Sequence, residues 1–559
     1  MNSSSLEKKY QRFISSFKES YAFFSQTERL VVHVLFVAIL VSGLTSLILF
    51  NSQYLVSNPR TGGTLTEGIV GVPRFINPLY AERDADRDLT SLIYSGLTRR
   101  TPQGNLIPDL AESWEISEDG LVYTFILKED AKFHDGTLLT AQDIVFTVEA
   151  IQESSTKSPF ERDWDGIAVQ ALNDSTVTFS LPKPFTPFIQ NTTLGILPQH
   201  LWENIGKENY LFSRYNLTPI GSGPYQIVST KRSLEETSQY TLKSFPEYLL
   251  GTPYIETISL LFYDTQKELV RAYENGVISG GQFAGDESQP LVLSEVFALF
   301  FNQSKNIFIQ DIDTREAILT LIDNEVLVNT LFSENAEALR TYIPTRLIPQ
   351  NHEVFTDLES EVAFEEMMED DGWEKDQSEF WSRKGSELAF TIATADNPLL
   401  IQVGQYLTEL LEDNGVRVTL EVYSPDDFLQ QVIRPRNFEV LLFGQQINHG
   451  LDLYGFWHSS QRNDPGLNIS QYTNLDANIY LERLREGNTP EEYQESLTQL
   501  LEAIEEEIPA IPLFARKIPY TLPEDLYANV PNLLVSPSER FNALYQWHKE
   551  RDSLWSIFR

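Results

Sequence analysis

One stretch of the chain, AKFHDGTLLTAQDIVFTVEAI, gathers side chains of the kinds that hydrolytic enzymes use. His134 lies beside Asp135, and Thr140, Asp143 and Glu149 follow within the next fifteen residues. An imidazole next to a carboxylate can transfer protons, and hydroxyl and carboxylate groups can act as nucleophiles or general bases. The same residue types also build turns and helix caps, so the elements around them decide between chemistry and architecture.

The pattern around these residues predicts a strand, a turn and a helix. The segment 131–133 ends a strand, and Gly136 can take the positive φ that a His-Asp-Gly turn needs. Thr140 stands at a helix N-cap with Asp143 three residues later, which is close to the capping-box pattern. The apolar residues that follow recur at helical spacing on one face, namely Ile144, Val145, Val148 and Ile151. Each polar residue thus has a local structural role, and the sequence favours architecture over catalysis.

No other pattern predicts a catalytic or metal site. The chain has no cysteine, which excludes disulfides, thiolate metal sites, cysteine nucleophiles and a lipid on an N-terminal cysteine. No Gly-x-Ser-x-Gly elbow is present, and the closest pair among the seven histidines, His449 and His458, is nine residues apart. We therefore expect no catalytic residues, no metal and no cofactor.

Length and charge limit the class of protein further. A chain of 559 residues is too long for one hydrophobic core, so we expect two to four domains. The 42% hydrophobic and 12% aromatic content is that of a folded protein. A net charge of -38 repels phosphate backbones and anionic lipid headgroups, which argues against nucleic-acid binding.

An uncharged apolar segment near the N-terminus predicts a membrane anchor. Residues 30–50, LVVHVLFVAILVSGLTSLILF, would span about 31 Å as a helix, which matches the hydrocarbon core of a bilayer. No cleavage site follows it. Five basic residues precede it, while only Arg60 follows closely, so residues 1–29 are expected in the cytoplasm and the bulk of the chain outside. Residues 51–61 are expected to be a short linker.

Beyond the linker, strand and helix patterns alternate to the C-terminus. GGTLTEGIVG and LVYTFILK alternate as strands do, and three segments have the periodicity of long helices: 313–332, 397–415 and 491–507. This mixture predicts an α/β or α+β assembly without a short repeat.

Several of these segments, taken in order, resemble the family 5 extracellular solute-binding proteins, the peptide- and nickel-binding receptors of ABC importers. The resemblance begins with ESWEISEDGLVYTFILKED and the strand–turn–helix stretch described above. It continues through GSGPYQIV, YLLGTPYIETISLLF, AYENGVIS, FNQSKNIFIQDIDTREAILTLIDNEVLV, FEEMMEDDGW, EEEIPAIPLF and RFNALYQWH. The segments cover roughly residues 62–548, so the order of many weak motifs carries the resemblance.

The resemblance implies an α/β, two-lobed periplasmic-binding-protein-like fold with an extra subdomain in lobe one, preceded by one transmembrane helix. Transferred to this chain, it divides the sequence as follows: lobe one at 62–108, 220–297 and 516–559, the extra subdomain at 109–219, and lobe two at 298–515. A ligand would lie between the lobes and be buried by hinge closure, and the closed form would dock on a permease.

The resemblance also implies where a ligand binds. Peptide-binding members hold an extended peptide largely through main-chain hydrogen bonds. The expected ligand-binding residues come from three places: Arg74, Phe75 and Asn77 in VPRFINPL; Phe301 and Asn302 in FFNQ; and Gln445, Gln446, Asn448, Asp452, Tyr454 and Trp457 in FGQQINHGLDLYGFW. The expected partners are a peptide or other small solute, the ABC permease subunits and the cell membrane, and the chain is expected to be a monomer.

Two departures from the family pattern leave the ligand open. Many peptide binders carry an acid just after this last strand to pair with the ligand's α-amine, and here Gln445 and Gln446 stand there. The ligand could be a blocked peptide, a longer peptide held by its backbone, or another solute, and Asp452 could be a contact or a turn residue. The anchor is the second departure. An anchored peptide sensor or adhesion protein is the alternative function, and an extracellular hydrolase has no supporting motif.

Overall fold

The computed structural model describes residue 15 and residues 23–233, 236–348, 361–486 and 489–555. The chain divides into two compact units, which are treated separately. The N-terminal unit contains the helix α2 (Gln26–Tyr54) and the strand β1 (Leu55–Arg60), which pairs antiparallel with β24 (Glu550–Trp555). The second unit comprises residues 61–549.

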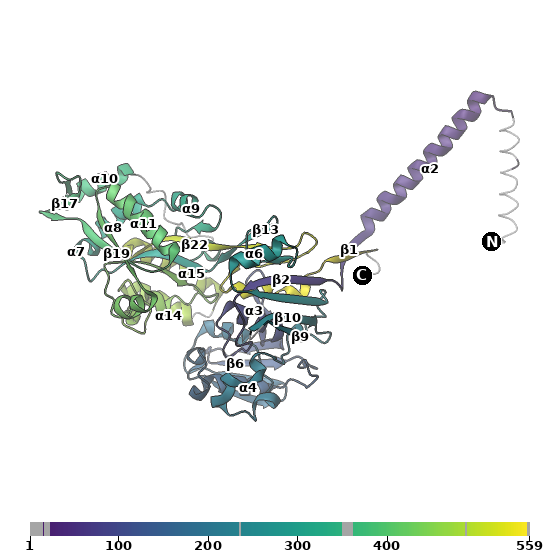
Figure 1. Ribbon diagram of the computed structural model, residues 1–559, viewed down its shortest axis with the longest axis horizontal. Helices are drawn as coiled ribbons and strands as arrows, with labels where there is room; N and C mark the ends of the chain where they lie inside the picture. The colour runs from purple at the N-terminus through teal and green to yellow at the C-terminus, as the bar shows by residue number, and fades with distance from the viewer. Residues whose placement is uncertain (1–14, 16–22, 234–235, 349–360, 487–488, 556–559) are drawn as a thin grey trace. The chain divides into compact units, whose positions relative to one another are not determined.

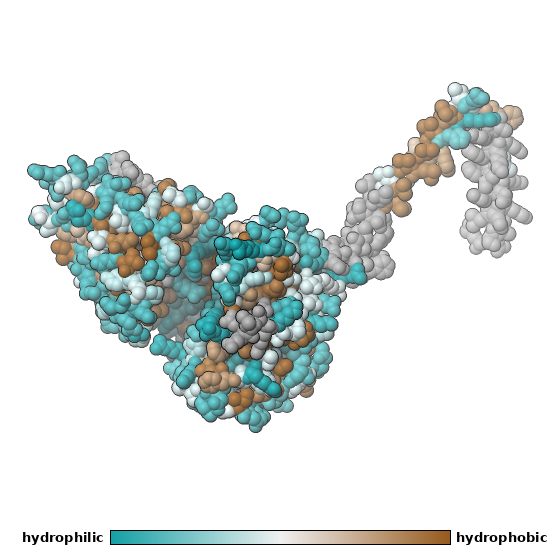
Figure 2. Space-filling model, viewed as in Figure 1, coloured by the Kyte–Doolittle hydropathy of each residue, from teal (hydrophilic) through white to brown (hydrophobic). Residues whose placement is uncertain are grey.

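The helix α2 has the composition of a membrane span. Its segment Gln26–Leu47 has a mean hydropathy of 2.4 over an 18-residue window, and none of that window is buried in the protein. Figure 2 shows it as a band of hydrophobic side chains. The Ser25 backbone N–H and hydroxyl both donate to Glu28 at 2.8 Å and so cap its first turn. The segment expected as a linker, 51–61, is not without structure: it holds the end of α2 and the strand β1.

The second unit is built on one large mixed sheet of thirteen strands (Figure 1). Its main path runs β20–β19–β21–β14–β22–β12–β2–β11–β10–β9, with β13, β15 and β23 attached beside it. The strands are β2 (Thr64–Val70), β9 (Tyr225–Ser233), β10 (Glu236–Ser244), β11 (Thr257–Tyr263), β12 (Gly280–Gly281), β13 (Ser288–Leu293), β14 (Glu295–Phe301), β15 (Ala336–Ala338), β19 (Ala389–Ala395), β20 (Arg417–Tyr423), β21 (Val440–Gln446), β22 (Ala510–Thr521) and β23 (Leu533–Leu534).

Two crossover segments run through both lobes side by side. β22 pairs antiparallel with β14 through Ala510–Phe514 and with β13 through residues 517–521. β13 and β14 are separated only by Ser294, whose hydroxyl donates to Ile447 O at 2.7 Å. The lobes are therefore joined by two antiparallel strands that are hydrogen-bonded to each other, which is the expected pair of crossovers.

The hydrophobic residues form separate cores on either side of these crossovers. One core contains residues from Leu65 to Leu293 together with C-terminal residues from Tyr520 to Trp547. Two others, on opposite faces of the sheet, are built from residues between Val292 and Ala515. The fold is two-lobed, as the sequence predicted, while the exact segment boundaries given above stay a prediction.

The first lobe carries a four-stranded antiparallel sheet in the order β5–β6–β8–β7, with α4 beside it (Figure 1). Besides strands of the large sheet, the elements of the first lobe include α3 (Asp84–Ile93), β3 (Thr98–Arg100), β4 (Leu106–Pro108), β5 (Ala111–Ile116), β6 (Val122–Leu127), α4 (Ala141–Gln152), the 3-10 turn η2 (Glu161–Trp164), β7 (Ala168–Asn173), β8 (Thr176–Ser180), η3 (Thr186–Thr193), α5 (Gln199–Trp202) and α6 (Gln266–Glu274).

The stretch with which the sequence analysis began is architecture. Gly136 has φ +86°, and the Asp143 carboxylate accepts hydrogen bonds from Thr140 N at 2.9 Å and Gln199 N at 2.9 Å. All four apolar residues predicted on one face of α4 are buried. Asp143 therefore caps the helix and ties it to a neighbouring segment.

Helices flank the sheet of the second lobe: α7 (Ile307–Gln310), α8 (Ile312–Leu321), α9 (Asn324–Leu331), α10 (Glu361–Asp370), α11 (Pro398–Asp413), α12 (Pro425–Asp427), α13 (Tyr454–Trp457), α14 (Leu475–Glu486) and α15 (Pro490–Glu507). A small sheet of β16 (Glu374–Lys375), β17 (Trp381–Arg383) and β18 (Ser386–Glu387) is also present. The single helix expected at 313–332 is wrong: α8 ends at Leu321, and Asp323 caps a new helix by accepting from Val326 N at 2.9 Å. The other two long helices agree with α11 and α15.

Candidate functional site

Three adjoining cavities lie along the first lobe, and one of them also reaches the second. We call them the interlobe cavity (about 570 Å³), the aromatic cavity (about 290 Å³) and the polar cavity (about 160 Å³). The interlobe and aromatic cavities share Asp163 and Asn191, and the aromatic and polar cavities share Ser91, Tyr94 and Thr193. Because neighbouring cavities share lining residues, the three form one continuous row, with the aromatic cavity in the middle.

The interlobe cavity has walls from both lobes. One wall consists of residues from η2 to η3: Arg162, Asp163, Asp165, Ile167, Leu181, Pro182, Lys183, Phe185, Pro187, Gln190 and Asn191. The other consists of Asn448, Gly450, Asp452 and Arg485. Its volume lies in the usual range of ligand sites, and it is bounded by elements that hinge motion would separate.

Arg485 joins the two walls. Its guanidinium donates two hydrogen bonds to the Asp452 carboxylate, both 2.7 Å long. It lies over the Tyr454 ring at 3.8 Å and over Phe185, from the other lobe, at 5.4 Å. Gly450 also approaches this lobe: a Cβ placed there would lie 3.2 Å from Pro187 Cβ. The second lobe thus contacts the first at one edge of the cavity.

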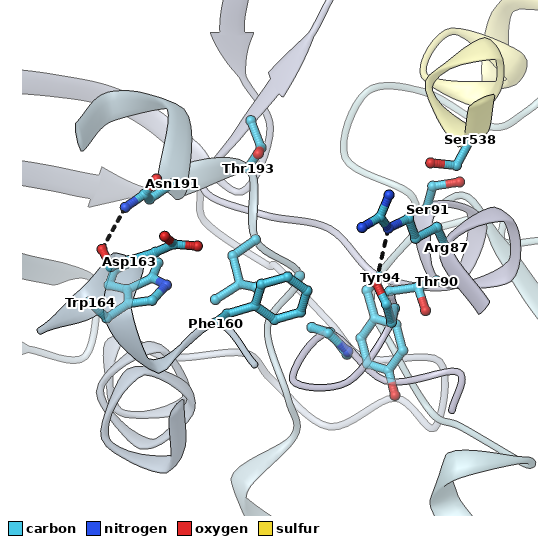
Figure 3. Close-up of a pocket in the computed structure, with 14 residues that line it drawn as sticks. Arg87, Thr90, Ser91, Tyr94, Phe160, Asp163, Trp164, Asn191, Thr193 and Ser538 are labelled. Carbon is cyan, nitrogen blue, oxygen red and sulfur yellow. Dashed lines mark hydrogen bonds between the residues drawn. The ribbon is translucent and has the colours of Figure 1, made fainter. Parts of the chain in front are cut away.

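The aromatic cavity lies between α3 and η2 (Figure 3). Trp164, which is 3% exposed, packs against Phe179 and Phe188 with centroid distances of 6.0 and 5.9 Å, and so fixes η2. The Asn191 amide donates to Asp163 O at 2.8 Å, which holds the same turn from the other side. Figure 3 shows Asp163 and Trp164 on one side of this cavity, Thr90 and Tyr94 on the other, and Phe160 between them.

Two carboxylates that line the polar cavity have hydrogen-bonding partners in the protein. Arg99 donates to Asp109 at 2.9 Å, and both side chains are almost fully buried. The His449 imidazole lies 2.9 Å from Glu539, whose carboxylate also accepts from Val535 N at 2.8 Å. Asp109 and Glu539 thus have protein partners, whereas Arg100, which also lines this cavity, donates to Gly104 O and Gln190 Oε1.

The cavities do not share the acidity of the chain. Six basic and five acidic residues line them together, whereas the whole chain has 42 and 80. The basic residues are Arg87, Arg99, Arg100, Arg162, Lys183 and Arg485, and the acidic residues are Asp109, Asp163, Asp165, Asp452 and Glu539. Such a balanced lining suits a ligand with charges of both signs better than a simple cation.

The structure brings together some of the residues predicted to bind a ligand. Asn448 and Asp452 line the interlobe cavity, and Tyr454 stacks on Arg485 beside them. The Asp452 carboxylate is occupied by Arg485, so here it holds the wall of the cavity.

Three other predicted residues of this segment do not line the cavities. Gln445 is 7% exposed, and the Gln446 amide donates to Val535 O. Trp457 is 2% exposed and packs in the second lobe's core against Tyr342 at 5.1 Å. In this conformation, Gln445 and Trp457 are buried, and Gln446 ties its loop to the C-terminal segment.

The loop VPRFINPL supports the aromatic cavity through its end. Pro78 lines that cavity. Arg74 N and Phe75 N both donate to Asp86 Oδ1, at 2.6 and 2.8 Å, and burial raises the pKa of Asp86. Asn77 is fully buried and donates to Asn216 Oδ1 at 2.9 Å. Arg74, Phe75 and Asn77 therefore position the loop.

The structure does not place Phe301 and Asn302 at the cavities. β14 pairs antiparallel with β21, so that Glu295 faces Gln446 whereas Phe301 faces Val440. Six residues of strand separate the two ends by about 20 Å. Phe301 and Asn302 are fully buried, and the Asn302 amide donates to Arg436 O at 2.9 Å. The sequence analysis expected both strands to lead toward the cleft, because it could not give their antiparallel register.

The prediction missed the wall supplied by η2 and η3 and the cation Arg485. SPFERDWDG contains two aromatic residues among alternating charges, without helical or strand periodicity. Aromatic residues in such a stretch are not accounted for by the buried face of a helix or strand. Their presence outside a regular element is the signal that could have marked this stretch as a binding segment.

Two lobes, paired crossovers and a cavity bounded by both lobes define a two-lobed extracytoplasmic solute-binding protein. Residues 105–466 match the family described as bacterial extracellular solute-binding proteins, family 5 Middle, and the chain belongs to this family.

Individual relatives agree with this assignment. The oligopeptide-binding protein AppA from Bacillus subtilis is 26% identical over 492 residues, covering 84% of this chain and 89% of AppA. Its structure in complex with a nonapeptide covers 88% of this chain and 100% of AppA, with a TM-score of 0.65 and 23% identity. The structure of NikZ from Campylobacter jejuni with Ni(L-His) covers 87% of this chain and 99% of NikZ, with a TM-score of 0.65 and 25% identity.

Proposed function

We propose that this chain is the membrane-anchored substrate-binding subunit of an ABC importer, and that it captures extended peptides between its lobes and delivers them to a permease. The observation that carries the proposal is the interlobe cavity, whose two walls come from opposite lobes and carry both charge signs. A peptide is zwitterionic and has apolar side chains, and a row of cavities about 570, 290 and 160 Å³ in volume offers room for several residues.

The hinge supplies the mechanism. A ligand that touches both walls favours the closed form by its differential affinity for that form. The two hydrogen-bonded crossovers allow the lobes to rotate as bodies while their own cores stay packed. Binding and release need no covalent chemistry, so we propose no enzymatic activity.

The remaining features of the proposal concern location. We propose that α2 anchors the chain in the cell membrane in a single pass, with residues 1–29 in the cytoplasm and residues 61–549 outside. Five basic residues before the span support this orientation. The acidic surface supports a monomer, because like-charged copies repel each other.

Native mass spectrometry of the full chain, extracted in detergent and followed by release and sequencing of bound molecules, tests this function. We expect a mixture of peptides, and an intact protein mass of 63.9 kDa because the anchor is not cleaved. A single bound non-peptide molecule would mean that the substrate belongs to another chemical class than peptides. A chain that carries no bound molecule, and whose melting temperature does not change when a broad mixture of peptides is added, would contradict the proposal and favour the sensor or adhesion function. Loss of growth on peptides as the sole nitrogen source, after deletion of the gene, would connect binding with uptake.

A further inference from the structure

Arg485 is a cation that the second lobe holds in one position at the edge of the interlobe cavity. It lies in the last turn of α14, and its guanidinium donates to both oxygens of the Asp452 carboxylate at 2.7 Å. Its Cζ lies 3.8 Å from the centre of the Tyr454 ring. A bidentate ion pair and a stacked ring leave this long side chain little rotational freedom, so its position is set within its own lobe.

Tyr454 is itself held from its other face. The His458 ring is stacked on it with a centroid distance of 4.0 Å and an interplanar angle of 12°. Arg485 and His458 both lie too close to the centre of this ring to share one face, so they cover opposite faces. His458 is 8% exposed, and its Nδ1 accepts from Ser460 N at 3.1 Å. Three stacked side chains of the second lobe therefore end in a cation that lines the cavity.

Phe185 is the aromatic residue of the first lobe that meets this cation. Its ring centre lies 5.4 Å from the Arg485 Cζ, within the range of cation–π contacts. The Phe185 carbonyl accepts from Phe188 N at 3.0 Å, and its side chain packs against the core of the first lobe. Both partners are thus fixed within their own lobes, and the contact between them depends on how the lobes meet.

Gly450 allows the two lobes to approach closely beside this contact. It lies two residues before Asp452, and Pro187 lies two residues after Phe185. A Cβ at position 450 would lie 3.2 Å from Pro187 Cβ and 3.4 Å from Gln190 Cγ, which is tighter than ordinary van der Waals contact. The backbone of the second lobe therefore touches η3 at the same edge, and opening of the hinge would separate both contacts.

We propose that Arg485 and Phe185 form a closure latch, a cation–π contact between the lobes that slows the release of bound peptide. This inference rests on the proposed peptide function, because it concerns how long the closed form lasts. Arg485 keeps its hydrogen bonds to Asp452 when the lobes separate, so opening breaks only the stacking contact. Such a contact changes an equilibrium about two- to thirtyfold, which lengthens residence but still permits delivery to a permease.

The test measures release from the full chain, immobilised in detergent and loaded with an equimolar pool of synthetic pentapeptides that have free ends. After washing, the peptides that stay bound are quantified by mass spectrometry at successive times. Phe185→Leu keeps an apolar side chain against the core but removes the aromatic face, and it should speed release about two- to thirtyfold. Phe185→Tyr keeps that face and should retain slow release.

A double-mutant cycle separates a latch from two independent contacts with the ligand. Arg485→Gln removes the cation and should also speed release. If the two side chains act through each other, Phe185→Leu has little further effect in the Arg485→Gln background, and the double variant releases peptides about as fast as Arg485→Gln alone. If each side chain contacts the peptide separately, the two effects multiply.

Two results have different consequences. If Phe185→Leu releases peptides at the unmodified rate, or if the two effects multiply, the closure latch is wrong and peptide binding stands. If the unmodified chain retains no peptide from the pool, the proposed function fails, and the latch falls with it.

Discussion

Two backbone groups fix the protonation state of His134. Gly223 O can only accept a hydrogen bond, so Nε2, 3.0 Å away, carries the proton, and Nδ1 accepts from Gly221 N at 3.3 Å. The ring also packs edge-on against Phe245 at 5.0 Å. Burial lowers the pKa of His134 from 6.5 to about 4. This histidine therefore joins the turn at Gly136 to the strand entry GSGPY and does not transfer protons.

The lowered pKa of His134 predicts an acid-dependent stability. Between pH 6.5 and 4 the unfolded chain binds a proton that the folded chain does not, so this histidine's contribution is full above pH 6.5 and is lost as the pH falls toward 4. The loss amounts to at most about 3 kcal/mol. His134→Gln should lower the free energy of unfolding at pH 7.5 and flatten its fall toward pH 4.5, as measured by urea denaturation.

Phe245→Leu is the matched control, because it changes the packing around His134 without removing the titrating group. It should lower stability by a similar amount at both pH values. An unchanged acid dependence in His134→Gln would show that other groups dominate.

At the residue scale, side chains with local roles were predictable from the sequence. Gly136, Thr140 and Asp143 act within a few residues of their own positions, and short-range rules describe them. The role of Asp452 as a wall residue was not predictable, because it depends on Arg485 from a later helix and on Phe185 from the other lobe. Such relations between distant segments are not visible in one sequence.

At the element scale, Asp143 serves two elements at once. Its carboxylate caps α4 through Thr140 N and accepts from Gln199 N at the start of α5, and its side chain is buried. Removal would leave buried N–H donors without partners, which typically costs 1–3 kcal/mol per group. The cap therefore also sets where α5 begins.

Asp143→Ala should lower the free energy of unfolding by about 2–3 kcal/mol, counting the lost cap and the unpaired Gln199 N–H. The urea midpoint measured by circular dichroism reports this change. Glu149→Ala on the exposed side of the same helix is the control and should stay within about 0.5 kcal/mol of the unmodified chain. Equal effects of the two substitutions would mean that the cap contributes no more than an exposed surface residue.

The accuracy of element prediction followed the range of the interactions. α15 was correct because apolar periodicity and Pro490 define it locally. The helix expected at 313–332 was wrong because Asp323 caps a new helix, and because α8 packs against α10 whereas α9 packs against β15 and β22. Phe301 and Asn302 were placed at the cleft because their strand was expected to lead there. The antiparallel pairing of β14 with β21 puts them at the other end, and register of this kind is set by distant partners.

At the scale of the whole molecule, the fold could be predicted because many weak motifs stand in one order over roughly residues 62–548. The site could not be predicted, since its walls come from segments far apart in the sequence, such as Pro187 and Gly450, which are 263 residues apart. In the proposed mechanism hinge closure brings these walls together, so motion and binding would be coupled through the same residues.

This proximity allows the motion itself to be tested. A Cβ at position 450 would lie 3.2 Å from Pro187 Cβ, near the 3.5–4.5 Å of disulfide-bonded pairs, and the chain has no cysteine to interfere. In the double variant Pro187→Cys and Gly450→Cys, oxidation should bridge the two walls. If release requires the lobes to separate, bound peptide should dissociate at least about tenfold more slowly after oxidation and recover its rate on reduction. The single variants supply the controls. A bridged protein that releases peptide as fast as its reduced form would show that the ligand leaves without hinge opening.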